Sequence, residues 1–194
     1  KLTYAGLEKV WAPFNHRYIP VYPVDKADEV CRVLGPDCDL TSMYQRAAEA
    51  ARAWIERAPD DAYAWFSLGD DLLALGDYEG AISAYDRARA IGLPEHMFWY
   101  RFGPFEAYLH SGQYEKVLAE SEPVLAALPG IEELRMLRGM ALEALGRVDE
   151  AVEEYRLAYV YHTDYAPAMA ALGRLGVNLP PRPTITPTPT PTAQ

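Results

Sequence analysis

Histidines, cysteines and paired carboxylates are the residues of this chain whose types could do chemistry. The histidines stand at positions 16, 96, 110 and 162, and none of them forms the His-x-x-x-His pair that would place two zinc ligands on one helical face. Asp70 and Asp71 are typical of the acidic pairs, and adjacent residues of a helix point about 100° apart. No Gly-x-Ser-x-Gly motif or phosphate-binding glycine loop accompanies them. We therefore expect no catalytic residues, no metal, no cofactor and no enzymatic activity.

Cys31 and Cys38 are the only cysteines, and Gly35-Pro36 lies between them. A disulfide between them would join the end of one expected helix to the loop that follows it. Even a loop of ~15 residues gains only about 3 kcal/mol from such a bond in the chain-entropy model. We predict the disulfide, with two reduced cytosolic thiols as the alternative.

The elements that position these residues are short amphipathic helices. The stretch WFSLGDDLLALGDYEGAISAYDRARA, residues 65–90, predicts two helices that meet at the turn Leu75-Gly76-Asp77. Neither helix can bury its apolar face alone. The apolar positions that follow helical spacing are Trp65, Leu68 and Leu72 before the turn and Ala81, Tyr85 and Ala88 after it.

This helical pair recurs along the chain. Gly76 of the first turn is matched by Gly112, 36 residues on, and by Gly146, 34 residues further. Positions within the helices follow the same offsets, as Tyr85, Ser121 and Tyr155 do. A period of about 34 residues with two helices per unit predicts an α-solenoid, in which stacked units bury a continuous core.

These repeats resemble the tetratricopeptide repeat family. The best unit, residues 62–90, carries the family's signature as Trp65, Leu68-Gly69, Ala81, Tyr85 and Ala88. The resemblance covers about residues 42–175 and implies an all-α, right-handed solenoid of about three full units with flanking helices. The second unit is divergent, because Gly103-Pro104 interrupts its first helix and Pro123 its second.

Helices are also expected on either side of the three units. Residues 44–59 read as the second helix of an earlier unit, with a capping box formed by Ser42 and Gln45. A partner helix is expected over residues 26–34. Residues 166–175 predict a single helix that caps the other end of the solenoid.

The resemblance implies that the first helix of each unit lines a concave groove. The stripe expected to face that groove is aromatic and Met-rich, with carboxylates at its edge, and it suits an extended peptide of a partner. It lacks the basic clamp with which some family members hold acidic tails. Its residues are Tyr63, Phe66, Asp70 and Leu73 in the first unit, Trp99, Phe102, Glu106 and Leu109 in the second, and Glu133, Met136, Met140 and Glu143 in the third.

Residues 1–24 carry large apolar side chains between prolines that favour an extended chain. Such side chains are expected to dock, either in the chain's own groove or in that of the next copy, which would build rings or filaments. We therefore divide the chain into a docking segment (residues 1–24), a solenoid (25–175) and a tail (176–194). The expected docking residues are Trp11, Phe14, Arg17, Tyr18, Ile19 and Tyr22.

The tail ends in PPRPTITPTPTPTAQ, with six Pro and five Thr in 15 residues. This composition predicts a semi-rigid spacer rather than a packed element. Thr-Pro runs are also typical acceptors of O-glycosylation, and an unmodified linker is the alternative. The candidate acceptors are Thr184, Thr186, Thr188, Thr190 and Thr192.

The net charge of −10 over 194 residues argues against nucleic-acid binding, because no basic stripe is present to displace phosphate counterions. No apolar run reaches the roughly 18 residues of a membrane span. We expect a protein-binding scaffold, and the alternative is a structural subunit of an extracellular homo-oligomer or filament. The tail and a start at Lys1 rather than Met favour an extracellular or cell-surface location over the cytoplasm.

Overall fold

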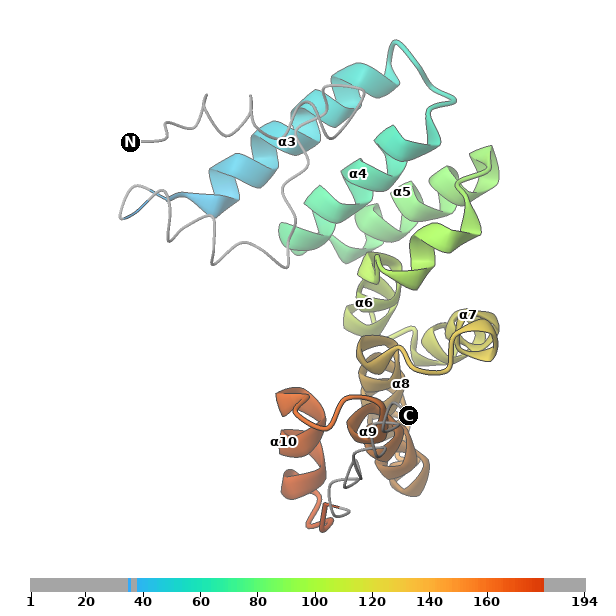
Figure 1. The fold of residues 1–194 in the computed structure, drawn as a ribbon. Coiled ribbons are helices and arrows are strands. Elements are labelled where there is room, and N and C mark those ends of the chain that lie inside the picture. The colour runs from blue at the N-terminus through green and yellow to red at the C-terminus, as the bar shows by residue number, and fades with distance from the viewer. Residues whose placement is uncertain (1–34, 36–37, 180–194) are drawn as a thin grey trace, which may run out of the picture. The chain divides into compact units, whose positions relative to one another are not determined.

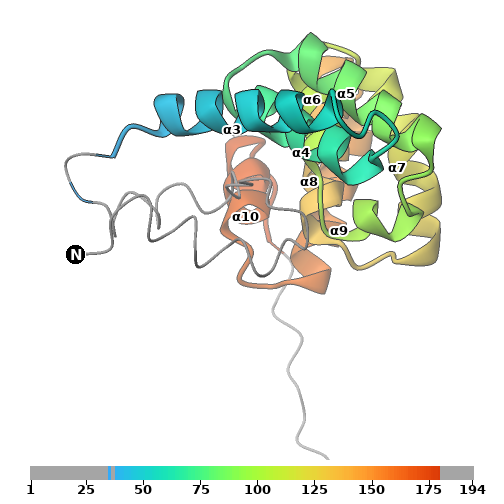
Figure 2. The same ribbon diagram turned by 90° about the horizontal axis from the view of Figure 1, so that it is seen from above.

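The computed structural model describes residue 35 and residues 38–179, and these residues fold into helices (Figures 1 and 2). The chain divides into two compact units, Lys1–Pro129 and Gly130–Gln194. The described helices of the first unit are α3 (Leu40–Ile55), α4 (Ala62–Ala74), α5 (Tyr78–Ile91), the 3-10 helix η3 (Glu95–Trp99), α6 (Gly103–His110) and α7 (Tyr114–Ala127). Those of the second are α8 (Glu132–Ala144), α9 (Val148–Tyr161) and α10 (Ala166–Arg174).

One turn geometry ends the first helix of each repeat. Gly76 adopts a φ of 79°, which only glycine reaches without strain. The amide of Asp77 then donates to the Leu72 carbonyl at 2.9 Å, so the last carbonyls of α4 find partners as in a Schellman motif. The same turn follows α6, α8 and α10 at Gly112, Gly146 and Gly176. The end of α10 therefore resembles the end of a repeat's first helix.

Helix α4 is the centre of the first unit. It packs against α3, α5 and α6, and its residues from Phe66 to Leu73 are all buried. This part of the helix is covered on all sides and has no face left for a groove. Figure 1 shows α3, α4 and α5 side by side, as their contacts require.

Helix α3 begins earlier than the sequence suggested. Its N-cap is Asp39, whose carboxylate accepts hydrogen bonds from the Ser42 amide at 3.1 Å and the Ser42 hydroxyl at 2.5 Å. These bonds lower the pKa of Asp39. The predicted cap at Ser42 was therefore wrong: Ser42 lies within the first turn, because an ionised carboxylate is the better acceptor at a helix N-terminus.

The middle repeat departs from its neighbours at its first helix. Helix α6 has 8 residues, whereas α4 and α8 have 13 each. The residues that would form its first turns are instead the 3-10 helix η3 and the segment 100–102. Pro104 lies in the first turn of α6, where its missing N–H costs nothing. Pro123 lies inside α7, which continues to Ala127, so it does not end that helix.

In the second unit, α9 packs against both α8 and α10. Its core includes Tyr155, which is fully buried. A methyl group on Gly139 would collide with the Tyr155 ring, and Gly69 stands in the same relation to Tyr85 in the first unit. The middle repeat reverses the pair, with buried Phe105 at the glycine position and buried Ser121 at the tyrosine position. The bulky residue has thus moved to the other helix of the pair.

Several predictions concern residues outside the described part of the chain. These are the docking segment 1–24, the helix expected at 26–34 and the five threonines of the tail. Of the two cysteines, Cys38 lies among the described residues and Cys31 lies outside them. The Cys31–Cys38 pairing and the domain boundaries stay predictions.

Candidate partner-binding surface

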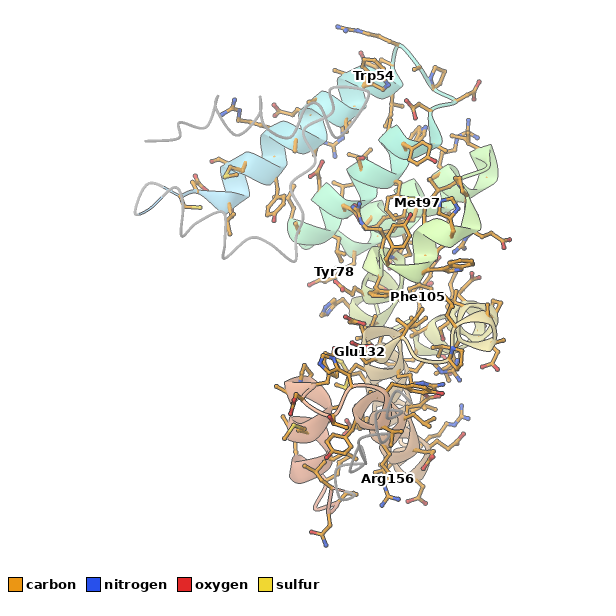
Figure 3. The ribbon with its side chains drawn as sticks, viewed as in Figure 1. Trp54, Tyr78, Met97, Phe105, Glu132 and Arg156 are labelled. Atoms are coloured by element: carbon orange, nitrogen blue, oxygen red, sulfur yellow. The ribbon has the colours of Figure 1, made fainter. Side chains whose placement is uncertain are left out.

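Phe66 of α4 lies in an aromatic cluster that closes over the predicted groove face. Its ring centroid is 5.1 Å from that of Tyr85 and 6.2 Å from that of Phe98 in η3. Phe98 in turn packs edge-on against Phe105 of α6, 6.3 Å away. Phe66 is 2% exposed as a result. Figure 3 shows these elements with their side chains, Met97 marking η3 and Phe105 marking α6.

Asp70 lies one turn after Phe66 and binds two residues from other elements. Its Oδ1 accepts a hydrogen bond from the Tyr85 hydroxyl at 2.7 Å, and its Oδ2 forms an ion pair with the Arg101 guanidinium. Burial, followed by the charge of Asp70, raises the pKa of Tyr85 well above its ordinary value. The tyrosine therefore stays a hydroxyl and donates to the carboxylate.

Gly103 allows α6 to approach this group. A methyl group there would collide with the Tyr85 hydroxyl and come within 2.9 Å of the Asp70 carboxylate. Because Gly103 is the first residue of α6, the carboxylate lies near the positive end of the helix dipole.

The groove stripe predicted from the sequence is only partly exposed. Phe66, Asp70 and Leu73 are buried on α4, and Leu109 is buried on α6. The expectation that these four side chains face an open groove was wrong. Phe66 and Asp70 are covered because Phe98 of η3 and Arg101 pack against them. Trp99 and Phe102 also do not lie on a first helix: Trp99 ends η3, and Phe102 is the N-cap of α6.

Other stripe residues do reach the surface. Tyr63 is 40% exposed at the start of α4, and Trp99 is 41% exposed. Glu106 on α6 is half-buried. In the second unit, Met140 and Glu133 are exposed, whereas Met136 and Glu143 are half-buried. Partner binding by these residues stays a prediction.

A compact set of exposed aromatic rings surrounds η3. The His96 ring lies 6.5 Å from that of Trp99 and 6.4 Å from that of Tyr100. Tyr100 is 57% exposed. We call His96, Trp99 and Tyr100 the η3 surface. Arg101, the ion-pair partner of Asp70, follows Tyr100 directly in the chain.

Asp71 is a second carboxyl of α4, and it has no hydrogen-bond partner on either oxygen. It is fully buried. At the repeat offsets its equivalents are Ala107 and Ala141, which are also fully buried. Burial, with a further contribution from Asp70, raises the pKa of Asp71 from 3.8 to about 8. This side chain is a neutral acid at neutral pH.

The second unit holds a related set of three side chains. The Tyr155 hydroxyl donates to Glu143 at 2.6 Å, and Arg174 of α10 binds the same carboxylate with two nitrogens at 2.9 and 2.6 Å. The Arg174 guanidinium, and then the Tyr155 hydroxyl, lower the pKa of Glu143. Nearby on α8, Arg135 and Arg138 both bind Glu154 of α9, at 2.8 and 2.9 Å.

The described residues contain neither a candidate metal site nor a candidate membrane-spanning helix. Within residues 38–179, no group of three or more His, Cys, Asp or Glu side chains could hold a metal ion. The helices of the same part also lack the length and apolar character needed to cross a membrane.

Two helices joined at a left-handed glycine recur along the chain, and in the first and third repeats a glycine of the first helix packs against a tyrosine of the second. The family model for the tetratricopeptide repeat matches residues 42–93 and 105–175. The chain belongs to the tetratricopeptide repeat family. The predicted family and the all-α repeat fold are both confirmed. The gap between the matched ranges contains η3 and Arg101, where the middle tetratricopeptide repeat is irregular.

A solved structure of the MamA RS-1 ArsTM double mutant is similar to this chain. The TM-score is 0.63 and the identity is 23%, over 78% of this chain and 84% of that one. At this identity the likeness concerns the fold. Tetratricopeptide repeats act as scaffolds for protein–protein interaction, and this is the functional class of the chain.

Arg101 and Tyr100 were missed by sequence reasoning. The groove was read from helical positions, and these two residues lie on a segment that the pattern assigned to a helix. A signal was present: the first two units are spaced by 36 residues and the next two by 34. The two extra residues fall where η3 replaces the start of the helix.

Proposed function

We propose that the chain binds a short extended segment of a partner protein at the η3 surface. The observation that carries this proposal is the exposure of Trp99 and Tyr100, at 41% and 57%. Aromatic rings are enriched at the centres of protein interfaces because they bury much area at a small cost in side-chain entropy. Tyr63 is a further exposed ring of the first unit, 40% exposed on α4 and one turn before Phe66, which packs on Phe98.

Charge also supports a partner for this unit. Asp70 and Glu106 carry two negative charges beside Tyr85, and Arg101 carries one positive charge. The whole chain has a net charge of −10. Electrostatic complementarity favours a segment with basic side chains.

A peptide selection would test the proposal. The full chain is immobilised and used to select peptides from a random display library, and binding of the selected peptides is measured by fluorescence anisotropy. We expect the double variant Trp99→Ala and Tyr100→Ala to bind them at least about tenfold more weakly, as for hot-spot residues. The matched control is Tyr161→Ala, which removes another exposed ring, 49% exposed, from the second unit.

Two outcomes would overturn the proposal: no peptide is enriched, or the double variant binds as tightly as the unchanged chain. A synthetic peptide of residues 11–24 joins the same assay, because the docking segment is the chain's own candidate for an extended aromatic ligand. Binding of that peptide, together with larger particles for the full chain than for a chain that begins at Asp25, would favour the self-assembly alternative.

A further inference from the structure

Arg101 enters a site that has the chemistry of an arginine receptor. Its guanidinium carbon lies 5.4 Å from the centroid of the Phe66 ring, and a guanidinium nitrogen pairs with Oδ2 of Asp70. The Asp70 side chain is 7% exposed and that of Arg101 is 36% exposed. The acceptor is therefore fixed in the fold, whereas the arginine that fills it reaches solvent.

Each part of this receptor suits a planar cation. An aromatic face attracts a guanidinium through its quadrupole, and a carboxylate binds its edge through charge-assisted hydrogen bonds. The Tyr85 hydroxyl holds the other oxygen of Asp70 at 2.7 Å, so the carboxylate is oriented before any ligand arrives. The negative charge of Glu106 also acts on Tyr85.

We propose that Arg101 occupies this receptor in place of a partner's arginine, and that binding exchanges the one for the other. The inference rests on the proposed function, because the adjacent η3 surface holds the rest of the partner segment. It specifies the ligand: an arginine with aromatic or apolar side chains beside it. Residue 101 lies between η3 and α6, so its side chain can leave without opening either helix.

An occupant within the chain acts as a competitor at high effective concentration. A residue tethered by a few bonds has an effective concentration of about millimolar or more. A partner must displace it, and its apparent affinity falls by the fraction of molecules in which the receptor is free. Removal of Arg101 should therefore strengthen the binding of an arginine peptide.

The first experiment uses the arginine-containing peptides from the display selection, with copies that carry citrulline in place of arginine. Citrulline keeps the shape of arginine and removes its charge. We expect Arg101→Ala to bind the arginine peptide about tenfold more tightly than the unchanged chain, and citrulline to remove that gain. Arg174→Ala, which removes the arginine of the related set in the second unit, should leave the affinity unchanged.

The second experiment needs no partner. Ethylguanidinium is titrated into Arg101→Ala, and binding is followed by the rise in the thermal unfolding midpoint and by tyrosine and tryptophan fluorescence. We expect saturable binding that the additional change Asp70→Asn abolishes, and no saturation in the unchanged chain over the same range. If circular dichroism shows that Arg101→Ala has lost helix, Arg101→Gln, which keeps a donor for Asp70, replaces it in both experiments.

The outcomes separate the two proposals. Peptides that require Trp99 and Tyr100 but ignore both citrulline and Arg101→Ala would leave the proposed function standing and overturn the arginine exchange. If no peptide binds, the proposed function fails, and the ethylguanidinium titration alone decides whether the receptor exists. An unsaturable titration, with the helix content intact, overturns it.

Discussion

The two units each join a repeat tyrosine, a carboxylate and an arginine, and they bury them to different depths. In the first unit, Tyr85 and Arg101 meet at Asp70, whose side chain is 7% exposed. In the second unit, Tyr155 and Arg174 meet at Glu143, whose side chain is 20% exposed, and Arg174 is 60% exposed. In both sets the arginine follows its carboxylate by 31 residues.

The tyrosine is the constant part of these sets, and the rest is not. Tyr85 and Tyr155 occupy the same repeat position, each against a glycine of the preceding helix. Asp70 and Glu143 stand at different repeat positions, because the equivalent of Asp70 in the third unit is Met140. The repeat thus supplies a buried hydroxyl that needs an acceptor, and each unit provides one in its own way.

Surroundings decide what each set can do. The first is enclosed by η3 and the start of α6, so its carboxylate is desolvated and depends on its two partners. In the second set Tyr155 is buried, but Glu143 and Arg174 reach water, where their ion pair is screened and worth about 0–1 kcal/mol. The deeper burial of the first set supports the binding role proposed for it, and the solvation of the second suits a modest structural role.

The units also differ at one buried position, where the first has Asp71 and the second Ala141. The largest effects on the free energy of unfolding are expected from introducing a carboxyl at position 141 or removing it from position 71. We expect Ala141→Asp to lower the free energy of unfolding by about 3–5 kcal/mol, because it buries an acid without a partner. Asp71→Ala should raise it by about 2–4 kcal/mol near neutral pH. Urea unfolding followed by circular dichroism, with hydrogen exchange to assign the change to a unit, measures both.

The contribution of Asp71 to stability should depend on pH. The pKa of Asp71 is about 8 in the folded chain, against an ordinary value of 3.8. Between these values the folded chain holds a proton that the unfolded chain has lost, so stability falls as pH rises. The slope is at most about 1.4 kcal/mol per pH unit for one group. Unfolding midpoints of the unchanged chain and of Asp71→Ala should converge towards the acid end of this window. Parallel curves would contradict the shift.

The sequence was sufficient for the repeat frame, because that frame is local. Its features lie within single helical hairpins. They are Gly76 and its equivalents, the Gly69–Tyr85 pair and the apolar periodicity. These features decide where helices end and which faces meet. The family and the all-α fold followed from them.

The candidate site could not be predicted from the sequence, because it depends on a segment that departs from the repeat pattern. The 3-10 helix η3 brings Phe98 and Arg101 onto α4, and a helical reading of residues 95–102 cannot place them there. The result is that Phe66 and Asp70 are covered and Trp99 and Tyr100 are exposed. The partnerless state of Asp71 was equally invisible, since it needs the neighbouring helices and not the spacing of acids.

Removal of each carboxylate tests the difference in burial directly. We expect Asp70→Ala to lower the free energy of unfolding by about 2–4 kcal/mol, because it leaves the buried Tyr85 hydroxyl without its acceptor and Arg101 without its ion pair. Glu143→Ala also removes the acceptor of the Tyr155 hydroxyl, but we expect a smaller loss of about 1–2 kcal/mol, since its ion pair with Arg174 is solvated. Salt of about 0.5 M should reduce the second effect more than the first. Equal losses in the two variants would refute the comparison.

The glycines beside the two arginines give the smallest and most selective test. Gly103→Ala adds a methyl group against the Tyr85 hydroxyl and Asp70, and we expect it to cost about 1–3 kcal/mol. Gly173→Ala lies within α10, and apart from the adjoining chain and the helix's own backbone no atom is within 4 Å of the new carbon. It should stabilise the chain by about 0.5–1 kcal/mol through helix propensity alone. We expect the thermal unfolding midpoint to fall in Gly103→Ala and to rise in Gly173→Ala, because the first site is enclosed and the second is open. A neutral Gly103→Ala would mean that α6 does not close on Asp70 as described.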